Sequence, residues 1–453
     1  MKIATTQRAL GALAGAWIVS LALAGCGGGD EGSSGAGSNA GNAGNGSAGA
    51  GGSGGTGGTG GTGGTGDNGG GGSVTPAAVT YLGAISFGDT IAITLDAPSA
   101  GKLKIRFADS AFGLSGTLIG NYTKSGSVYT VANLAEDSAD PPPAFVSALL
   151  GSITATFTVS GTTLTGEISG LPKLSGTGKL SGHISASSLS TPATSASLAG
   201  TYSLITTQST YYAISGNLQT QYGFGGQMRV NADGSVRMCQ GDYSDTCGGS
   251  RPALGTLLPA DQTRYPGAYE LTINGVLQGR VFTLPAGGAQ TLYLDLNLRN
   301  NQGEKVTGTA IFRPAQTLAG AQVAGRWTCS QPAVSYQRPT GIGMSVGLDG
   351  VMQASTYTIS VHGDITDVAT GTSTTLLMNL ARNSLAGTSQ TMAVSGIMSG
   401  EWTVPASTLG VRSQVFLPID AVTMAYFAEM LVPNPNTGIS TVALVQGKCS
   451  KAG

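Results

Sequence analysis

Side chains that could carry out acid–base catalysis are scarce in this chain. Its 453 residues include only two histidines, His183 and His362, although histidine is the side chain that most often transfers protons in enzymes. Each histidine falls in line with serine or threonine in an alternating run, so we expect both on the exposed face of a strand. The His-Glu-x-x-His arrangement of zinc peptidases does not occur in the sequence. These observations favour a protein that is not an enzyme.

Carboxylates occur in two small groups, of which one could bind a cation and the other could do acid–base work. Asp242 and Asp245 lie in a short segment and could offer oxygen ligands to calcium, but their spacing does not match an EF-hand. Glu136, Asp137 and Asp140 stand before three consecutive prolines, where a solvated turn accounts for their charge. We therefore expect exposed acidic loops, keep Asp242 and Asp245 as weak metal candidates, and expect no metal and no cofactor.

Aromatic side chains are the other candidates for function, because they combine apolar area with a polar group for a ligand. The ligand-contact candidates are Tyr202, Tyr211, Tyr212, Tyr222 and Trp327. The four tyrosines are concentrated in one stretch of the chain. Positions in the core or at the rim of a strand are the alternative interpretation, and the sequence leaves both open.

The elements that must position these residues are strands. Apolar and polar residues alternate over 102–107, 153–159 and 292–298. A period of two predicts strands with one buried and one solvated face, which is typical of antiparallel sheets. Asn-Gly at 274–275 and Asp-Gly at 349–350 indicate tight hairpins between such strands. We predict an all-β fold built mainly from antiparallel sandwich or barrel modules.

At most one or two short helices are expected beside these strands. Residues 142–150 could form two helical turns, and Asp420 could cap a helix over 421–431. Val422 and Thr423 in that second segment would also suit a strand, because β-branched residues favour strands.

A glycine-rich segment precedes the part of the chain that is expected to fold. Residues 27–73 consist almost entirely of Gly, Ser, Ala, Asn and Thr, and such a composition buries too little apolar surface to offset the entropy of ordering. We predict a disordered linker with an r.m.s. span of about 35–40 Å. Beyond it we expect β domains at 75–189, 198–321 and 322–453, the last two of which could form one unit.

The charge of the chain argues against nucleic acid as a partner. The formal net charge is −1, with 22 basic and 23 acidic residues. Removal of a leader containing Lys2 and Arg8 would leave 20 basic against 23 acidic residues, or −3. The sequence lacks the clustered basic residues that nucleic-acid binding requires.

The beginning of the chain carries a targeting signal. An apolar stretch over residues 9–24 is shorter than the roughly 20 residues of a membrane-spanning helix and follows two basic residues. It ends in Leu-Ala-Gly-Cys at 23–26, which resembles the lipobox of bacterial lipoproteins. The resemblance implies a signal peptide over 1–25 and a covalent lipid on Cys26, with acyl chains such as palmitate in the bilayer. Gly27, in place of aspartate, implies an outer-membrane lipoprotein that faces the periplasm or the outside.

Four further cysteines are expected to form disulfides. They are Cys239, Cys247, Cys329 and Cys449. An even number in an exported chain argues for two bridges, for which three pairings are possible. We favour Cys239 with Cys247, which would close a short loop, and Cys329 with Cys449, which would join the first and last strands of a C-terminal module.

A five-residue phrase occurs twice in the chain. Leu-Ala-Gly-Thr-Tyr at 198–202 is similar to Val-Ala-Gly-Arg-Trp at 323–327, and an Asp-Gly hairpin signal follows each. The similarity indicates a diverged repeat of two β modules, with one large β domain as the alternative. Gly-Arg-Trp at 325–327 also weakly resembles the opening of lipocalin-like barrels, and that resemblance implies a barrel able to hold a small apolar ligand.

Together these features favour a membrane-anchored, non-catalytic lipoprotein of the cell envelope. Its role would be structural, or it would bind an unidentified protein or small ligand. A lipocalin-like carrier would require a closed barrel with a sizeable apolar cavity, whereas a surface adhesin would expose an apolar patch or an open strand edge. A hydrolase is the alternative that we favour least.

Overall fold

The computed structural model describes most of the chain beyond the glycine-rich segment. All of the described residues belong to one compact unit. They are residues 78–96, 101–175, 178–247, 252–286, 289–300, 302–385 and 388–452. Cys26 and the glycine-rich segment lie outside the described residues, so what we predict for them stays a prediction.

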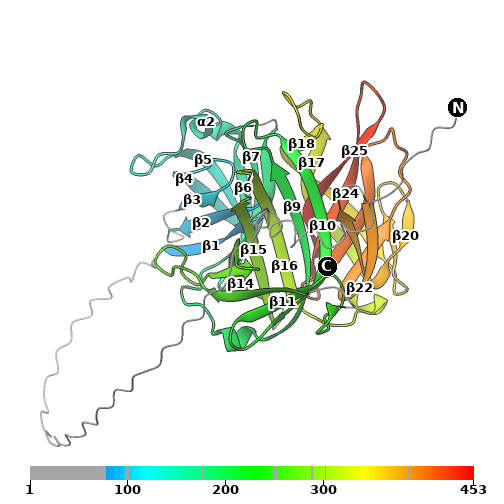
Figure 1. The fold of residues 1–453 in the computed structure, drawn as a ribbon. Coiled ribbons are helices and arrows are strands. Elements are labelled where there is room, and N and C mark those ends of the chain that lie inside the picture. The colour runs from blue at the N-terminus through cyan, green and yellow to red at the C-terminus, as the bar shows by residue number, and fades with distance from the viewer. Residues whose placement is uncertain are drawn as a thin grey trace, which may run out of the picture. The chain divides into compact units, whose positions relative to one another are not determined.

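The described residues form an all-β protein, as the alternating pattern predicts. The first eight strands run antiparallel, each paired with the next, and β8 pairs with β1 to close a barrel (Figure 1). We call these strands the first barrel. They are β1 (Val79–Ile85), β2 (Asp89–Leu95), β3 (Lys102–Ser110), β4 (Thr117–Ser125), β5 (Val128–Glu136), β6 (Thr154–Ser160), β7 (Thr163–Leu171) and β8 (Leu180–Ser187).

The next eight strands close in the same way. Neighbours in the chain pair antiparallel, and β16 returns to pair with β9 from Tyr202 to Tyr211. We call them the middle barrel. They are β9 (Gly200–Tyr211), β10 (Leu218–Val230), β11 (Ser235–Cys239), β12 (Ala253–Pro259), β13 (Tyr269–Ile273), β14 (Val276–Ala286), β15 (Ala289–Arg299) and β16 (Lys305–Pro314).

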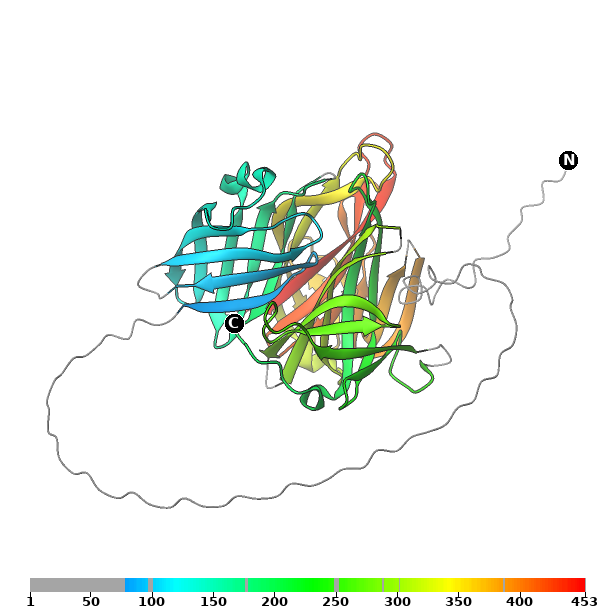
Figure 2. The same ribbon diagram turned by 60° about the vertical axis from the view of Figure 1, so that its left-hand side comes forward.

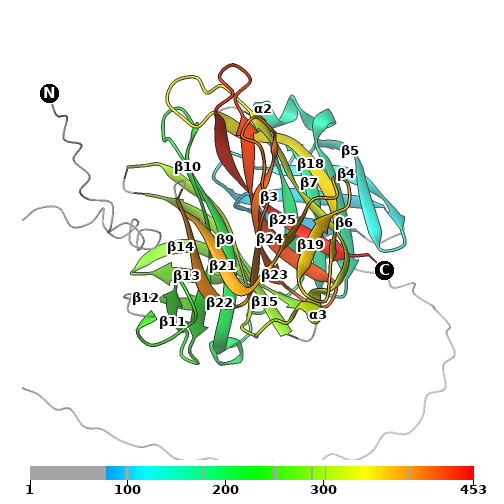
Figure 3. The same ribbon diagram turned by 90° about the vertical axis from the view of Figure 1, so that its right-hand side faces the viewer.

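The remaining strands form an array in which β17 pairs with β18 on one side and with β25 on the other. We call this array the last barrel. Its strands are β17 (Gly325–Tyr336), β18 (Val346–Ile359), β19 (Asp364–Asp367), β20 (Ser373–Thr375), β21 (Leu377–Leu385), β22 (Thr388–Glu401), β23 (Gly410–Pro418), β24 (Thr423–Pro433) and β25 (Ser440–Lys451). A short β10–β21 pairing joins it to the middle barrel, so that β9–β25 make one closed sheet (Figure 3).

Each barrel is filled by the apolar side chains of its own strands. In β3, for example, Leu103, Ile105 and Phe107 point inward while the lysines and arginine between them are exposed. Tyr129 stacks on Phe157 inside the first barrel with ring centroids 5.3 Å apart. Comparable buried clusters occupy the middle and last barrels. The period of two therefore produces three packed interiors.

The first barrel packs against the middle barrel through a small apolar contact layer. Leu82 and Ala84 of β1 lie against Phe282 and Leu284 of β14, and Figure 2 shows the blue strands of the first barrel beside the green strands of the middle barrel. The turn between β1 and β2 comes closest, because a Cβ on Gly88 would lie 2.3 Å from the backbone nitrogen of Gly308. Only glycine permits this approach of two backbones.

One of the two expected helices is absent from the structure. Residues 144–147 form the short helix α2 (Ala144–Ser147), as expected, and a second short helix, α3 (Gly320–Val323), precedes β17. The helix predicted over 421–431 is wrong, because this segment is strand β24, which pairs with β23 and β25 along its length. Within the described residues, the helices are all too short to cross a lipid bilayer.

Both disulfides join the cysteines that we favoured as pairs. Cys239 is bonded to Cys247 at the end of β11, where it closes a short loop. Cys329 is bonded to Cys449 directly across the β17–β25 pairing. The second bond therefore links two neighbouring strands of the last barrel that are 120 residues apart in the chain.

Candidate functional site

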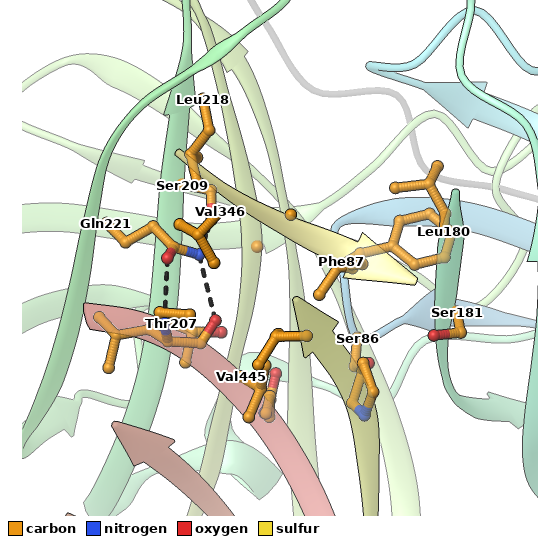
Figure 4. Close-up of a pocket in the computed structure, with 18 of the residues that line it drawn as sticks. Ser86, Phe87, Leu180, Ser181, Thr207, Ser209, Leu218, Gln221, Val346 and Val445 are labelled. Atoms are coloured by element: carbon orange, nitrogen blue, oxygen red, sulfur yellow. Dashed lines mark hydrogen bonds between the residues drawn. The ribbon is translucent and has the colours of Figure 1, made fainter. Parts of the chain in front are cut away.

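A cavity of about 60 Å³ lies where the three barrels meet (Figure 4). The first barrel contributes the β1–β2 turn, the segment after β7 and the start of β8. The middle barrel contributes β9, β10 and β16, and the last barrel contributes β17, β18 and β25. We call this space the junction cavity. Its lining includes Ser86, Phe87, Lys173, Leu180, Ser181, Thr207, Ser209, Tyr211, Leu218, Gln221, Gly308, Val334, Val346, Val445 and Gln446.

The polar wall of the junction cavity is held by the amide of Gln221. Its nitrogen donates to Ser209 Oγ and to the backbone oxygen of Leu444, at 3.1 Å in both cases. Its oxygen accepts from the backbone nitrogen of Leu444 at 2.9 Å (Figure 4). This side chain thus links β9 and β10 to β25 and leaves hydroxyl and amide groups along one side of the cavity.

The apolar wall comes from valine, leucine and phenylalanine side chains of all three barrels. Phe87 lies edge to face with Phe112, with ring centroids 5.7 Å apart. Val334, Val346 and Val445 of the last barrel are buried. The cavity therefore offers one polar and one apolar side to a ligand.

Lys173 supplies the charge of the junction cavity. Its ammonium lies 5.8 Å from the ring centroid of Tyr211, within reach of a cation–π interaction. None of the described residues places a carboxylate within 4 Å of this ammonium. Burial lowers the pKa of Lys173 to about 8, because desolvation disfavours the charged form. An ammonium without a carboxylate partner therefore lines this space.

Tyr211 is the one aromatic candidate from the sequence that lines the junction cavity. Its ring lies edge to face with Phe112 at 5.3 Å, and burial raises the pKa of its hydroxyl to about 12. Tyr212 and Tyr222 are half-buried and do not line it. The rest of the wall combines apolar, hydroxyl and amide side chains with Lys173. These residues are spread over the chain from residue 86 to 446, so no local sequence pattern marks the wall.

Tyr202 and Trp327 are buried inside their barrels and lie away from the cavity. The Tyr202 hydroxyl donates to the backbone oxygen of Leu198 at 2.9 Å. Trp327 Nε1 donates to the backbone oxygen of Val323 at 2.8 Å. Each aromatic side chain thus caps the helical turn that precedes its strand, in the two copies of the five-residue phrase. This shared arrangement is what a diverged repeat predicts.

The acidic candidates for a metal are engaged in ordinary loop contacts. Asp242 Oδ1 accepts from the backbone nitrogen of Ser395 at 2.7 Å, and Asp245 Oδ1 lies 3.9 Å from Arg237 Nη1. Asp137 accepts from Lys104. Across the part of the chain that the structure describes, no group of three or more His, Cys, Asp or Glu side chains is placed to hold a metal ion.

His183 is buried, and the prediction that it is exposed is wrong. Its Nε2 lies 2.8 Å from the backbone oxygen of Ser330, and its Nδ1 lies 3.7 Å from Glu167 Oε1. Strands β17 and β18 cover this face of β8, which the pattern of β8 alone does not reveal. Burial is the main reason why the pKa of His183 lies below its usual value. His362 is exposed, as expected, in the turn after β18.

Ser330 and Ser345 each have one feature found in hydrolases. Ser330 lies close to a glutamate and a histidine, and Ser345 lies in a hydrolase-like motif, but neither serine is arranged as a nucleophile. Ser330 Oγ donates to Glu167, while the His183 imidazole contacts the Ser330 backbone instead of its hydroxyl. Residues 343–347 have the Gly-x-Ser-x-Gly spacing of a nucleophile elbow. Our sequence-based predictions did not include this motif. Ser345 stands immediately before the antiparallel strand β18, whereas a nucleophile elbow requires a sharp turn from strand to helix.

A second polar cluster is buried between the first and middle barrels. Thr90 donates to Asp295, Ser110 donates to Asp89 at 2.5 Å, and Arg280 pairs with Asp109. Asp89 and Asp295 are fully buried. Desolvation is the main cause that raises the pKa of Asp295 to about 7 and the pKa of Asp89 well above its usual value. This cluster joins the first and middle barrels, and its contribution to stability depends on whether Asp89 and Asp295 are protonated.

Comparisons with known proteins add a single weak likeness. No family model and no curated protein matches this chain. A solved structure of a protein of unknown function from the DUF3598 family of Nostoc punctiforme is similar at 11% identity over 57% of this chain and 99% of that chain. Its TM-score of 0.20 is too low to indicate a shared fold. The antiparallel barrels themselves are consistent with the lipocalin-like resemblance of the sequence.

Proposed function

We propose that this protein is a non-catalytic lipoprotein of the cell envelope that binds a small ligand in the junction cavity. The observation that carries the proposal is the junction cavity itself, in which three packed barrels each contribute side chains to one space with a polar and an apolar wall. Small-molecule sites are typically concave and largely apolar, with a few polar groups that point toward the ligand.

A carrier that encloses its ligand inside a barrel is the weaker alternative. The middle barrel encloses a space of only about 20 Å³ among Leu204, Leu271 and Phe312, whereas a cavity that binds benzene measures roughly 150 Å³. The junction cavity, at about 60 Å³, is also smaller than that benzene site. It has room for a small polar head group, and the rest of a ligand would lie outside it.

The non-catalytic part of the proposal is supported by the surroundings of the two histidines. His362 lies in an exposed turn, and the His183 imidazole bonds to a backbone oxygen. Among the described residues, neither imidazole has a hydrogen bond to a hydroxyl group. Substrate screening of the full chain with ester, peptide and glycoside libraries tests this point, and any turnover lost in His183→Gln would overturn it.

Anchoring through Cys26 is tested separately from ligand binding. We expect mass spectrometry of the mature protein to find acyl chains on an N-terminal Cys26. We also expect Cys26→Ser to release the protein from the membrane fraction. An unmodified terminus, or unchanged fractionation of the variant, would remove the lipoprotein part of the proposal.

Ligand binding is tested by native mass spectrometry of the full chain released from its own membranes. We expect a bound small molecule on the wild type and its loss in Val346→Phe, because the larger ring projects into the junction cavity. Val361→Phe, in an exposed turn after the same strand, is the matched control and should keep the ligand. Equal occupancy in both variants would place the ligand elsewhere.

Contact with a protein partner is the second candidate function, because the structure exposes an apolar patch. Leu174, Ile214 and Ile342 are 62%, 99% and 78% exposed. They lie on three loops next to the junction cavity, and we call them the apolar rim. Replacement of all three by serine should abolish partner capture if the apolar rim is an adhesive surface. Unchanged capture would rule that function out for this patch.

A further inference from the structure

We propose that the ligand of the junction cavity is a small organic anion with a single negative charge and a short apolar chain, held by the Lys173 ammonium. This inference depends on the proposed function and names its ligand class. Three features of the described residues carry it: the unpaired charge of Lys173, the neutral character of the other polar groups, and the position of the apolar rim.

The charge of Lys173 calls for a counter-ion. The side chain lines the junction cavity and lies over the Tyr211 ring at 5.8 Å. Burial of an ammonium without a partner costs free energy, and no carboxylate of the described residues lies within salt-bridge distance of Lys173. A bound anion would supply the missing charge.

The remaining polar groups limit the ligand to one charge. Ser209 and Thr207 offer hydroxyl groups, and the Gln221 amide is engaged with Ser209 and Leu444, so none of these groups adds positive charge. One ammonium balances one carboxylate, whereas a phosphate dianion would remain undercompensated. The site therefore fits a monocarboxylate better than a phosphate ester.

The apolar rim accounts for the chain of such a ligand. Leu174 directly follows Lys173, and Ile214 lies in the turn between Tyr211 and Leu218. The loops touch one another, because the Asn217 side-chain nitrogen donates to the backbone oxygen of Ile342 at 3.1 Å and Gly216 lies directly against Ser175. A chain that leaves the cavity past Tyr211 would meet these exposed side chains.

The test uses calorimetric titration of the full chain carrying Cys26→Ser, so that no acyl chain on the protein competes. Hexanoate is the probe, and 1-hexanol is the neutral probe of equal chain length. We expect hexanoate to bind more tightly than hexanol. Lys173→Met should weaken hexanoate binding by roughly 10- to 100-fold, the usual size of a lost charged hydrogen bond, and leave hexanol unchanged.

Two further variants separate the charge from general damage. Lys173→Arg should retain most of the affinity, because the positive charge stays. Lys124→Met removes an ammonium that lies 5.1 Å from the ring of Tyr129, outside the cavity, and should leave hexanoate binding as it is. Circular dichroism of each variant checks that the barrels have formed.

The outcomes distinguish the inference from the function on which it rests. Equal binding of hexanoate and hexanol, unaffected by Lys173→Met, would overturn the anion assignment while cavity binding remained. Loss of hexanoate affinity in Lys124→Met as well would also overturn it. Absence of any probe binding, together with no molecule found by native mass spectrometry, would remove both the inference and the proposed function.

Discussion

Thr90 of the first barrel donates a hydrogen bond to the buried carboxylate of Asp295 in the middle barrel. The bond crosses the contact between two barrels, and Asp89 lies near Asp295 in the same contact, close enough to raise its own pKa further. The first barrel therefore rests on a polar cluster whose charge changes with pH. Stability should depend on pH for this reason.

The first prediction concerns that pH dependence. The pKa of Asp295 is about 7 in the folded protein and near 3.9 in an unfolded chain. A raised carboxyl pKa means that the folded state holds the proton more tightly, so the contribution of Asp295 to stability is largest below about pH 4 and falls until about pH 7. In Asp295→Asn, the free energy of unfolding should fall by up to about 4 kcal/mol less over this pH range than in the wild type. Thermal melts between pH 4 and pH 8 measure it.

The control for that experiment is Asp245→Asn, which changes an exposed carboxylate. Its melting temperature should follow the wild type at every pH. Because the pKa of Asp89 is also raised, the stability of Asp295→Asn should still fall to a smaller extent as the pH rises. A slope identical to that of the wild type would contradict the assignment of the raised pKa to Asp295.

The second prediction concerns the ion pair between Arg280 and Asp109. The Arg280 side chain is 12% exposed, and its guanidinium carbon lies 3.8 Å from the ring centroid of Tyr265. Arg280→Met should cost about 3 kcal/mol in the free energy of unfolding, because it leaves a partly buried carboxylate without its partner. Denaturant unfolding gives the value.

Lys104→Met is the matched control for Arg280→Met. Lys104 pairs with Asp137, and its side chain is 57% exposed. Exposed ion pairs contribute little to stability because solvent screens them, so this variant should be nearly as stable as the wild type. Equal costs for both variants would show that burial does not decide the strength of these pairs.

The third prediction compares the two disulfides. Cys329 and Cys449 are 120 residues apart in the chain, and Cys239 and Cys247 are 8 apart. By the loop-entropy relation, loss of the long-range bond should cost about 5 kcal/mol and loss of the short one about 2.5 kcal/mol. Unfolding of the two double Cys→Ser variants under oxidising conditions tests the order. A larger loss from the short loop would contradict it.

The fourth prediction concerns the aromatic caps of the repeated phrase. Tyr202→Phe keeps the ring and removes only the hydrogen bond to Leu198, so it should cost about 1 kcal/mol. Trp327→Ala empties a fully buried site and should cost about 3–5 kcal/mol. Tyr212→Phe, at a half-buried position, is the control. A cost of Tyr202→Phe no larger than that of Tyr212→Phe would contradict a stabilising cap by the Tyr202 hydroxyl.

Local sequence patterns predict the strands well, because each strand must hide one face whatever it packs against. The alternation of Leu103, Ile105 and Phe107 leads directly to a buried row in β3. Asn274 and Gly275 both adopt positive φ angles, as a tight hairpin requires. The segment 421–431 is less clear from sequence, since its strand state depends on pairing with β23 and β25.

The sequence by itself determined the all-β class, the hairpin at 274–275 and the presence of two disulfides, since these follow from periodicity, turn chemistry and an even cysteine count. It favoured one of three cysteine pairings, which the structure then showed. Only the tertiary structure decided that His183 is buried and that Lys173 and Tyr211 share a cavity with Val445. The physical reason is that burial of an outward-facing side chain depends on a neighbouring barrel far away in the chain. The alternation of residues within a strand predicts which face is apolar. It does not predict which other part of the chain covers the opposite face.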